Sequence, residues 1–507
     1  MKSQIIEMKE CLIRDREMIF NLGLPAFCFS FIFWVMPIAD TFQFDSDEGQ
    51  EMVKALLYSQ GFALYGEIWS DQPPLFTFLL SHWLNVFDFL GDSIFAARLL
   101  VLCFSTLLLW SFSQILRLNL GMIPAIVGTI LLIFSLNFMR LSVSIMIGLP
   151  SLSLAMLSIY LLFLFCEKNQ YFYLTMLSGM AFALSLQLKM YTIFLFPLIL
   201  FYWWERHKEK APRKKYWRFL PAIIWCLSVL GTFAIAGFLL GALDLQNFFQ
   251  FHLTNNVKDA FPNQNSFHDI TIMYLQDLDY GLLAILGTRT IWKYRDTLAK
   301  FPLMWLILAT GILLNHKPIW YHHYLLLSIP LTWLATYGIV VAMEELKKMG
   351  WFAAWKNRKL RDIFKLRYAA IALIFSGLVL PVKLSFLVLQ NQQFFQESRD
   401  RQEVLQQLVQ YRDSTHWIFT DIPMYAAHAG LNVPPEIATL SRKRIASQEI
   451  SDDFLKSLFA KYSPEQCLIE KLPELEPPLD AYFGRDYNKI SYKYKHYRAI
   501  HYIRNDL

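Results

Sequence analysis

Charged side chains are scarce in this sequence. Asp, Glu, Lys and Arg together make up 17% of the 507 residues, whereas hydrophobic residues make up 55% and the mean hydropathy is +0.33. A water-soluble fold of this length needs more polar side chains to cover its surface. The composition therefore excludes a soluble protein and predicts an α-helical polytopic membrane protein.

Cysteine is also scarce, with six in the chain. Only Cys467 lies beyond residue 390, so no disulfide can form within the C-terminal part. No Cys-rich metal motif is present, and neither is an internal repeat or a low-complexity tract. The C-terminal part must therefore fold without a disulfide.

Apolar runs of nearly membrane-spanning length fill the first 390 residues. A helix needs about 20 residues to cross roughly 30 Å of hydrocarbon. Eleven runs approach this length, at 18–39, 94–116, 121–139, 145–166, 171–188, 191–204, 219–243, 270–287, 301–315, 322–343 and 368–390. Charged residues precede the first run and no small-residue cleavage site follows it, so we expect a retained span and not a signal peptide. About 11 transmembrane helices are thus predicted for a domain at 1–390.

The distribution of basic residues predicts the orientation. With the N-terminus in the cytoplasm, the cytoplasmic segments hold about 25 Lys and Arg, and the opposite loops hold about five. This bias places the large first loop (40–93) and the segment 391–507 on the outer side of the membrane, which we expect to be the plasma (bacterial inner) membrane. The net charge of +6 therefore marks topology and indicates no nucleic-acid partner.

The segment 391–507 differs in composition from the rest. A helical pattern at 392–411 is followed by a strand pattern at 416–421, a helical pattern at 424–429 and a turn at 432–435. We expect a small extracytoplasmic α/β domain of about 110 residues, which is within the usual size of a domain.

Two acidic motifs lie in the large first loop. DSDE at 45–48 directly follows the first apolar run, and SDQPP at 70–74 comes later in the same loop. An isolated D-x-D-E motif is more often a solvated loop than a functional site. Carboxylates next to a bilayer, however, often take part in chemistry.

The predicted topology places the residues of both acidic motifs and several other polar residues on the same outer face of the membrane. They are Asp45, Asp47, Glu48, Asp71, Arg140, Lys189, His252, His268, Lys317, His322, His323 and Tyr324. Each also has an ordinary explanation: Lys189 either reaches the lipid headgroups or holds an anion, and the HHY motif at 322–324 is typical of an aromatic belt at the interface.

Together these residues suit the headgroup of a polyprenyl-linked phosphate. Cations and a divalent metal ion neutralise a phosphate leaving group. A nearby carboxylate removes the proton from an acceptor hydroxyl as its oxygen attacks the sugar carbon. One base and one neutralised leaving group suffice for single-displacement glycosyl transfer.

The two acidic motifs also resemble a known family. FDSDEG at 44–49 followed by SDQPPL at 70–75 is similar to the first outer loop of the dolichyl-phosphate-mannose protein mannosyltransferase and lipid A aminoarabinose transferase superfamily, often called glycosyltransferase family 39. Similar segments recur at 188–190, 248–252, 317–326, 417–421 and 433–436. The resemblance implies a GT-C fold and an inverting glycosyltransferase that uses a polyprenyl-phosphate sugar.

The resemblance also implies roles for single residues. Asp47 is the implied general base, with Glu48 supporting it or a metal ion. Asp71 and His252 are the implied ligands of a divalent metal ion such as Mg, Mn or Zn. The implied phosphate-binding residues are Lys189, Lys317 and Tyr324, and from its place on the outer face we expect Arg140 to join them.

The chain departs from the family pattern in two places. Gln72 stands where the family has Lys, which removes one cation from the phosphate site. The segment 147–150 reads IGLP, where aminoarabinose transferases carry an acidic residue before Pro. The acceptor, which is a lipid, a glycan or a protein, therefore need not be lipid A.

Two other functions stay open. The chain is alternatively a transporter or flippase of lipid-linked sugars, which would carry ionisable residues at mid-membrane depth and broken helices in matching halves. It is alternatively a catalytically inactive assembly subunit, which would agree with the two departures.

Overall fold

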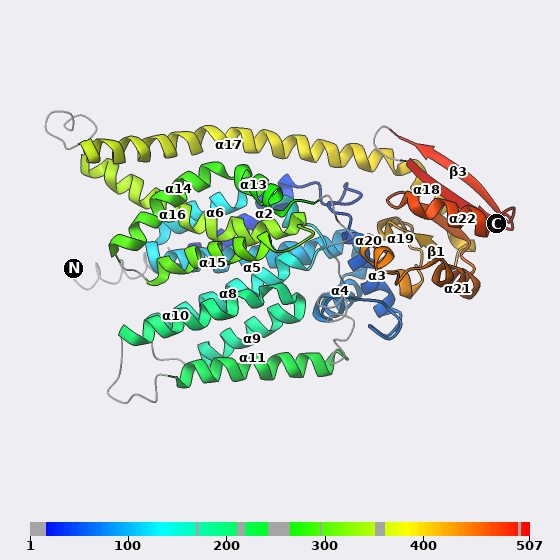
Figure 1. The fold of residues 1–507 in the computed structure, drawn as a ribbon, viewed down its shortest axis with the longest axis horizontal. Coiled ribbons are helices and arrows are strands. Elements are labelled where there is room, and N and C mark those ends of the chain that lie inside the picture. Colours follow the sequence, from blue (N-terminus) through cyan, green and yellow to red (C-terminus); the bar gives the residue numbers. More distant parts are fainter. Residues whose placement is uncertain are drawn as a thin grey trace, which may run out of the picture.

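The structure is a computed structural model that describes residues 17–168, 172–209, 219–241, 264–294, 297–349, 360–494 and 498–507. Within these ranges most residues are helical, and one four-stranded sheet lies near the C-terminus (Figure 1).

The apolar runs form a bundle of roughly parallel or antiparallel helices (Figure 1). Its elements are η1 (Ile19–Gly23), α2 (Leu24–Val35), α5 (Ser93–Leu120), α6 (Met122–Ile133), α7 (Phe138–Leu141), α8 (Gly148–Lys168), α9 (Phe172–Leu188), η3 (Met190–Phe194), α10 (Leu195–Glu209), α11 (Leu220–Leu239), α13 (Ser266–Gln276), α14 (Leu278–Tyr294), α15 (Thr297–Leu314), η7 (Tyr321–Tyr324), α16 (Leu325–Met349) and α17 (Leu360–Asp400).

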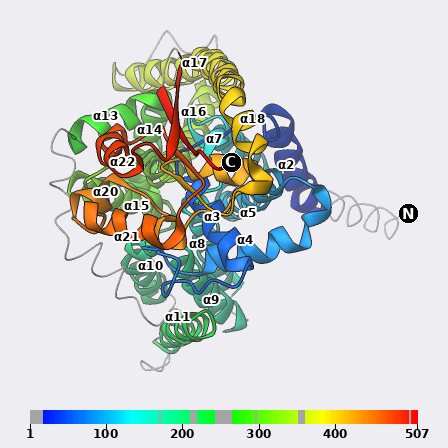
Figure 2. The same cartoon turned by 90° about the vertical axis from the view of Figure 1, so that its right-hand side faces the viewer.

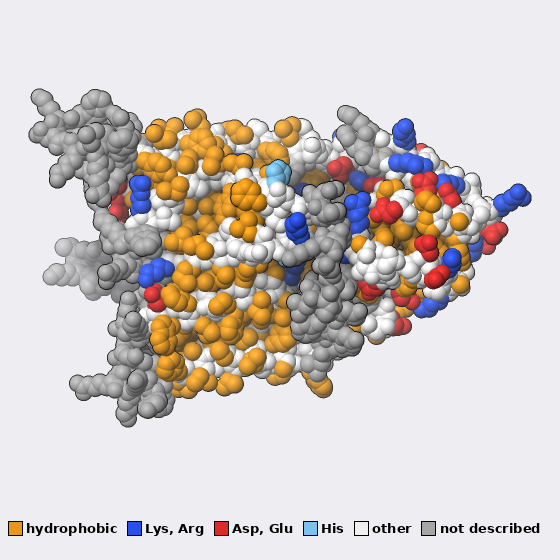
Figure 3. Space-filling view, viewed as in Figure 1, with side chains coloured by type: hydrophobic (Ala, Val, Ile, Leu, Met, Phe, Trp, Pro, Cys, Tyr) orange, Lys and Arg blue, Asp and Glu red, His pale blue; other side chains and the backbone are white. Residues whose placement is uncertain are grey.

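The surface of this bundle is apolar. Figure 3 shows a broad band of hydrophobic side chains across the face of the bundle in view, with charged side chains gathered beyond the band. Among the described residues, five helices are long and apolar enough to cross a membrane, and a bent pair makes a sixth candidate. Six shorter apolar helices accompany them. The predicted helical membrane fold is confirmed, whereas the number of eleven spans stays a prediction.

The run at 270–287 differs from the expected single helix. It consists of α13 and α14, which meet at Asp277 with a bend of 84°. Asp277 and Asp279 lie at this break, and both form ion pairs with Lys383 of α17. A buried carboxylate must be paired in an apolar bundle, and Lys383 supplies this pairing at the break.

Helix α17 connects the bundle with the C-terminal domain. It continues unbroken from Leu360 to Asp400 and runs along the whole bundle (Figure 1). The chain therefore passes the expected boundary at residue 390 inside a helix.

The C-terminal domain, from α18 to β4, combines a sheet with short helices. Its elements are α18 (Gln402–Gln410), η8 (Arg412–Ser414), β1 (Ile418–Thr420), α19 (Pro423–Ala429), η9 (Pro435–Ile437), α20 (Arg442–Ala446), α21 (Asp452–Tyr462), β2 (Gln466–Ile469), η10 (Pro473–Leu475), α22 (Glu476–Phe483), β3 (Tyr487–Lys493) and β4 (Arg498–Arg504).

The strand order in this sheet is β1-β2-β4-β3. Strands β1 and β2 are parallel, with Phe419 opposite Cys467. Strand β4 lies antiparallel to β2 and β3, so that Tyr502 faces Cys467 on one side and Lys489 on the other. The sheet with its covering helices confirms the predicted small α/β fold.

The large first loop forms helices of its own, namely α3 (Glu48–Ser59), α4 (Leu75–Val86) and η2 (Asp88–Leu90). Met52 and Phe76 of these helices share a buried core with Phe419 and Met424 of the C-terminal domain. Figure 1 shows α3 and α4 between the bundle and this domain, and Figure 2 shows the domain covering that end of the bundle. The acidic loop is therefore enclosed between two structural layers.

Candidate active site

The acidic motif at 45–48 lies where α3 begins. Asp47 is the residue before the helix and Glu48 is its first residue. A Cβ atom on the following residue, Gly49, would lie 2.2 Å from the backbone nitrogen of Met424 in α19. Only glycine permits this close approach. The start of α3 is thus fixed against the backbone of the C-terminal domain.

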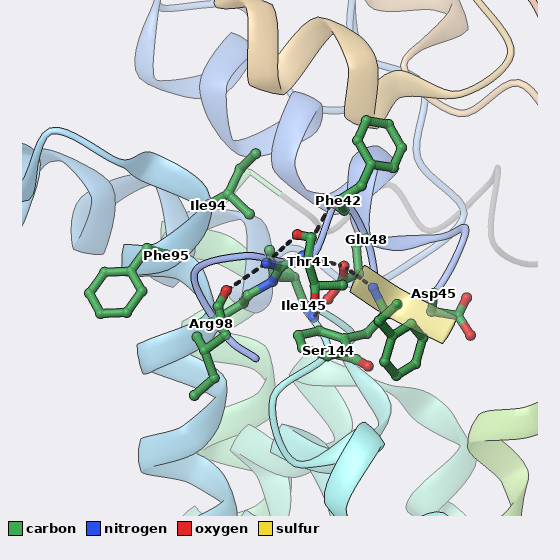
Figure 4. A network of polar contacts seen from close by, with 12 residues as sticks. Thr41, Phe42, Asp45, Glu48, Ile94, Phe95, Arg98, Ser144 and Ile145 are labelled. Carbon is green, nitrogen blue, oxygen red and sulfur yellow. Dashed lines mark hydrogen bonds and ion pairs between the residues drawn. The ribbon is translucent and has the colours of Figure 1, made fainter. Parts of the chain in front are cut away.

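Glu48 is fully buried, and both of its carboxylate oxygens are satisfied (Figure 4). Oε1 accepts a 2.7 Å hydrogen bond from the backbone N–H of Ile145. Oε2 accepts from the backbone N–H of Phe44 at 2.8 Å and from Nη2 of Arg98 at 3.1 Å. The carboxylate predicted to assist Asp47 or a metal ion is thus engaged in joining the loop to α5 and to the segment before α8.

Arg98 completes this network. Its Nη1 donates to the backbone oxygens of Ile38 at 2.7 Å and Thr41 at 2.8 Å, and its Nη2 donates to Phe42 O at 3.3 Å. The guanidinium therefore ties the end of the first apolar run to α5 (Figure 4). Nothing in the apolar pattern of the run 94–116 separates this arginine from an interfacial one, and sequence reasoning did not identify it.

Arg140 and Asp45 form a second pair in the same loop. Nη2 of Arg140 lies 3.3 Å from Oδ2 of Asp45, and Nε donates to the backbone oxygen of Phe44 at 2.7 Å. The guanidinium also lies 4.1 Å from the centre of the Tyr321 ring. Burial, and next the charge of Asp47, raise the pKa of Asp45 to about 6, and Arg140 acts against this shift. The predicted phosphate-binding Arg140 thus has a partner within the loop.

Asp47 differs from Asp45 and Glu48 in the groups that contact its carboxylate. It is half-buried, its backbone N–H donates to Oδ1 of Asp45 at 3.1 Å, and Ser46 Oγ donates to its Oδ1 at 3.4 Å. An arginine holds each of Asp45 and Glu48, but within the described ranges Asp47 forms no direct ion pair. Its carboxylate is the one in the motif that stays available as a base.

Lys189 lies between α9 and η3. Its Nζ is 3.0 Å from Nε2 of His322 and 5.2 Å from the centre of the Tyr191 ring. An ammonium group has no lone pair, so His322 is the acceptor. Burial lowers the pKa of Lys189 to about 8, and the charges of Asp47 and Asp71 act against this shift. Lys189 is therefore an electrostatic neighbour of both acidic motifs.

Asp71 lies in the turn before α4 and is half-buried. It interacts electrostatically with Lys189 and with Lys443 of α20. Three predicted residues from distant parts of the sequence, Asp47, Asp71 and Lys189, are thus brought together. We call these three residues the polar cluster.

Tyr324 is buried, and its hydroxyl donates a short hydrogen bond to Oδ2 of Asp277. Lys383 donates to Oδ1 of the same carboxylate at 2.7 Å and lies 2.8 Å from Asp279. The aromatic ring of Tyr280 lies 3.6 Å from the Lys383 ammonium. The hydroxyl predicted to hold a phosphate thus belongs to a buried charge network at the α13–α14 break, which sequence reasoning missed.

Replacing Tyr324 by Phe tests this placement. The buried Asp277 carboxylate would lose one donor, so we expect the free energy of unfolding to fall by about 1–3 kcal/mol. Thermal unfolding in detergent measures this loss. Tyr368→Phe is the matched control, because the Tyr368 hydroxyl donates only to the backbone oxygen of Leu282 at 3.1 Å. Unchanged stability with weaker binding of polyprenyl phosphate would instead assign the Tyr324 hydroxyl to the phosphate.

The remaining predicted residues are less constrained. Lys317 lies between α15 and η7, is half-buried, and forms no side-chain hydrogen bond or ion pair in the described part of the chain. His252 lies outside the described residues. Among the described residues no group of three His, Cys, Asp or Glu side chains is arranged to hold a metal ion.

An apolar groove of about 820 Å³ lies between α10 and α15. Its walls include Leu198, Met304, Ile307 and Leu308, and its polar end includes Asn315 and His316.

A row of histidine rings leads from this end toward the polar cluster. The His316 ring lies 5.1 Å from the ring of His323, which lies 4.5 Å from that of His322, the partner of Lys189. Contacts among these three histidine rings thus link the polar end of the groove to Lys189 of the polar cluster.

Comparison with known proteins agrees with this architecture. Residues 71–235 match the model of the dolichyl-phosphate-mannose-protein mannosyltransferase family. No curated protein matches the chain by direct sequence comparison.

Several solved structures share the fold. ArnT from Cupriavidus metallidurans bound to undecaprenyl phosphate matches with a TM-score of 0.59 and 10% identity, over 96% of this chain and 97% of that chain. The archaeal oligosaccharyltransferase AglB from Archaeoglobus fulgidus, in complex with an inhibitory peptide and a dolichol-phosphate, matches with a TM-score of 0.55 and 10% identity, over 94% and 74%. An A. fulgidus oligosaccharyltransferase complex with Zn and sulfate matches with a TM-score of 0.55 and 10% identity, over 93% and 72%.

The family match covers one part of the chain, and the fold match covers nearly all of it. Both agree with the resemblance seen in the first loop. The chain therefore has the GT-C fold of ArnT and AglB, and its residues 71–235 are similar to the dolichyl-phosphate-mannose-protein mannosyltransferase family.

Proposed function

We propose that the protein is an inverting glycosyltransferase that moves a sugar from a polyprenyl-phosphate donor to an acceptor. The observation that carries the proposal is the polar cluster, in which Asp47, a carboxylate with no direct ion pair among the described residues, lies near the half-buried Lys189. A base and a cation are the two groups that single displacement requires.

The chemical step uses both groups. Asp47 accepts the proton of the acceptor hydroxyl while its oxygen bonds to the anomeric carbon of the sugar. The bond from that carbon to the phosphate oxygen breaks on the opposite face, and its electron pair leaves with the polyprenyl phosphate. Lys189 stabilises the charge that develops on the phosphate, since its pKa of about 8 keeps it protonated at neutral pH.

The apolar groove suits the polyprenyl chain of the donor. Its walls are aliphatic, and its polar end is connected through His316, His323 and His322 to Lys189. A lipid tail in the groove would place its phosphate near the cation. The lipid phosphates in the solved structures of ArnT and AglB support a donor of this class.

We also propose the arrangement in the membrane. Residues 1–390 form the catalytic transmembrane domain and 391–507 an extracytoplasmic domain. The N-terminus lies in the cytoplasm and the polar cluster at the outer surface of the plasma (bacterial inner) membrane, as the charge bias of the loops predicts.

Metal dependence belongs to the same proposal. The carboxylate of Asp71 is an oxygen donor of the kind that Mg²⁺ and Mn²⁺ prefer, and the A. fulgidus enzyme was solved with Zn. A bound divalent ion would add positive charge beside the leaving phosphate. Asp71 and His252 are the residues that we propose as its ligands.

Removal of divalent ions by EDTA is expected to lower turnover at least tenfold. Adding one kind of divalent ion at a time to the EDTA-treated protein then identifies the metal, because only ions suited to the ligands restore turnover. EDTA already saturated with the same ion is the control for other effects of the chelator. Full activity in excess EDTA would contradict the metal proposal and remove Asp71 and His252 as ligands.

One observation favours the alternative of a transporter of lipid-linked sugars. Asp277, Asp279 and Lys383 are buried charges inside the bundle at a broken helix, as transporters have. These charges pair with one another, however, and this pairing by itself accounts for their burial in the bundle. Transport of a lipid-linked sugar in liposomes without glycosyl transfer would favour the transporter, whereas inactivity in both assays would favour an assembly subunit.

The donor and the acceptor can be identified in a deletion strain. Mass spectrometry of its lipid-linked sugars and envelope glycans should find an accumulating polyprenyl-phosphate sugar, which is the donor. The missing glycoconjugate is the acceptor. Unchanged lipid-linked sugars and glycans would contradict the proposed function.

A further inference from the structure

Helix α20 of the C-terminal domain is attached to the segment that carries Asp71. The guanidinium of Arg444 lies 4.1 Å from the centre of the Trp69 ring, and the backbone N–H of Trp69 donates to Pro435 O at 3.3 Å. Nε1 of Trp69 donates to Glu449 at 2.6 Å, and the same carboxylate forms a 3.3 Å ion pair with Arg444. These contacts hold α20 beside the polar cluster.

Lys443 precedes Arg444 in this helix. Burial lowers the pKa of Lys443, and the charges of Asp71 and Asp47 act against this shift. Lys443 also interacts electrostatically with Lys189. Lys443 is therefore a neighbour of every member of the polar cluster, although it comes from the other domain.

The basic residues in and beside the first loop are engaged in other ion pairs. These pairs are Lys54 with Glu51 at 2.8 Å, Arg98 with Glu48 at 3.1 Å, and Arg140 with Asp45 at 3.3 Å. The residue that follows Asp71, Gln72, is neutral. The cations that face Asp47 and Asp71 thus come from outside this loop, from Lys189 and Lys443.

The charges of the cluster indicate what Lys443 does. Asp47 and Asp71 together outweigh Lys189, so the three residues alone would repel an anionic ligand. A second cation brings the four side chains to balance. With Lys443 present, two cations offset the two carboxylates, so the cluster no longer repels an anionic phosphate and offers it two ammonium donors.

We propose that Lys443 binds the phosphate of the donor together with Lys189, so that the C-terminal domain supplies part of the substrate site. This inference rests on the proposed function, because it takes a polyprenyl phosphate as the ligand. It assigns the C-terminal domain a direct role in binding, in addition to covering the end of the bundle.

Binding of undecaprenyl phosphate to the full-length protein in nanodiscs tests the proposal. Lys443→Met should weaken binding by about 10-fold or more, the loss expected for one charge-assisted hydrogen bond. Lys443→Arg should keep most of the affinity. Arg442→Met is the matched control, because Arg442 lies in the same helix, is exposed and pairs with Glu474 at 3.7 Å.

The uncharged lipid undecaprenol separates binding from structure. If Lys443 acts on the phosphate, Lys443→Met weakens binding of the phosphate form and leaves binding of the alcohol unchanged. An equal loss for both lipids, or no loss for either, would overturn the proposal. Should Lys443→Met unfold, Lys443→Gln, which keeps a polar side chain, takes its place in the same comparison.

The same experiment keeps the two proposals apart. A wild-type protein that binds no undecaprenyl phosphate and turns over no donor would contradict the proposed function itself. A wild-type protein that does both, with Lys443→Met equal to it, would contradict only the role of Lys443.

Discussion

Replacing Asp47 by Asn is expected to reduce the release of polyprenyl phosphate by about 10²–10⁴-fold or more, the usual contribution of a general base. Asn has the same shape as Asp but cannot accept the proton of the acceptor hydroxyl. The carboxylate is half-buried and, within the described ranges, has no direct ion pair, so the fold should tolerate the change. Turnover of a polyprenyl-phosphate sugar by the purified variant measures the effect.

Asp40→Asn is the matched control for this experiment. Asp40 lies in the same loop, carries the same group and is exposed, so its replacement should leave turnover within about twofold of the wild type. Thermal unfolding of both variants verifies that the fold is retained. Unchanged turnover in Asp47→Asn would remove Asp47 as the base.

Breaking the ion pair of Glu48 with Arg98 should have the largest effect on stability. Arg98→Met would leave the fully buried Glu48 carboxylate with two backbone N–H groups and no cation. An uncompensated buried charge costs about 3–5 kcal/mol. We expect poor expression of this variant and a markedly lower thermal midpoint in detergent.

A double variant distinguishes charge from packing. Glu48→Gln combined with Arg98→Met removes both charges and should regain part of the stability, since no unpaired charge remains. Glu67→Gln, an exposed change in the same loop, should have little effect. A stable but inactive Glu48→Gln variant would instead indicate a direct part for Glu48 in the chemistry.

The helices of the bundle could largely be predicted from the sequence, because membrane helices are marked by their apolar length. The run 94–116 lies within α5 and the run 145–166 largely coincides with α8. The ion pair at the bend could not be predicted, because the partner of Asp277, Lys383, lies in a different helix. The apolar pattern of one run contains no information about the charge that it will meet.

The arrangement of the candidate site residues could be predicted only in part, because it also depends on contacts between distant parts of the sequence. The sequence singled out Asp47, Asp71 and Lys189, and the fold brings these three together. The sequence could not show that Glu48 pairs with Arg98 and that Tyr324 donates to Asp277, because these partners are distant in sequence.

Lys443 was missed because it lies in the basic run RKR at 442–444 of the other domain. Such runs are usually solvated. The contacts that Trp69 makes with Arg444, Glu449 and Pro435 bring this run to the polar cluster.

The most direct test of the proposed function is the release of polyprenyl phosphate by the purified wild-type protein. The protein in detergent or nanodiscs is mixed with the donor that accumulates in the deletion strain and with the missing acceptor. We predict release of polyprenyl phosphate together with a glycosylated acceptor of inverted anomeric configuration. A donor that stays intact, or that crosses a liposome membrane without losing its sugar, would contradict the account.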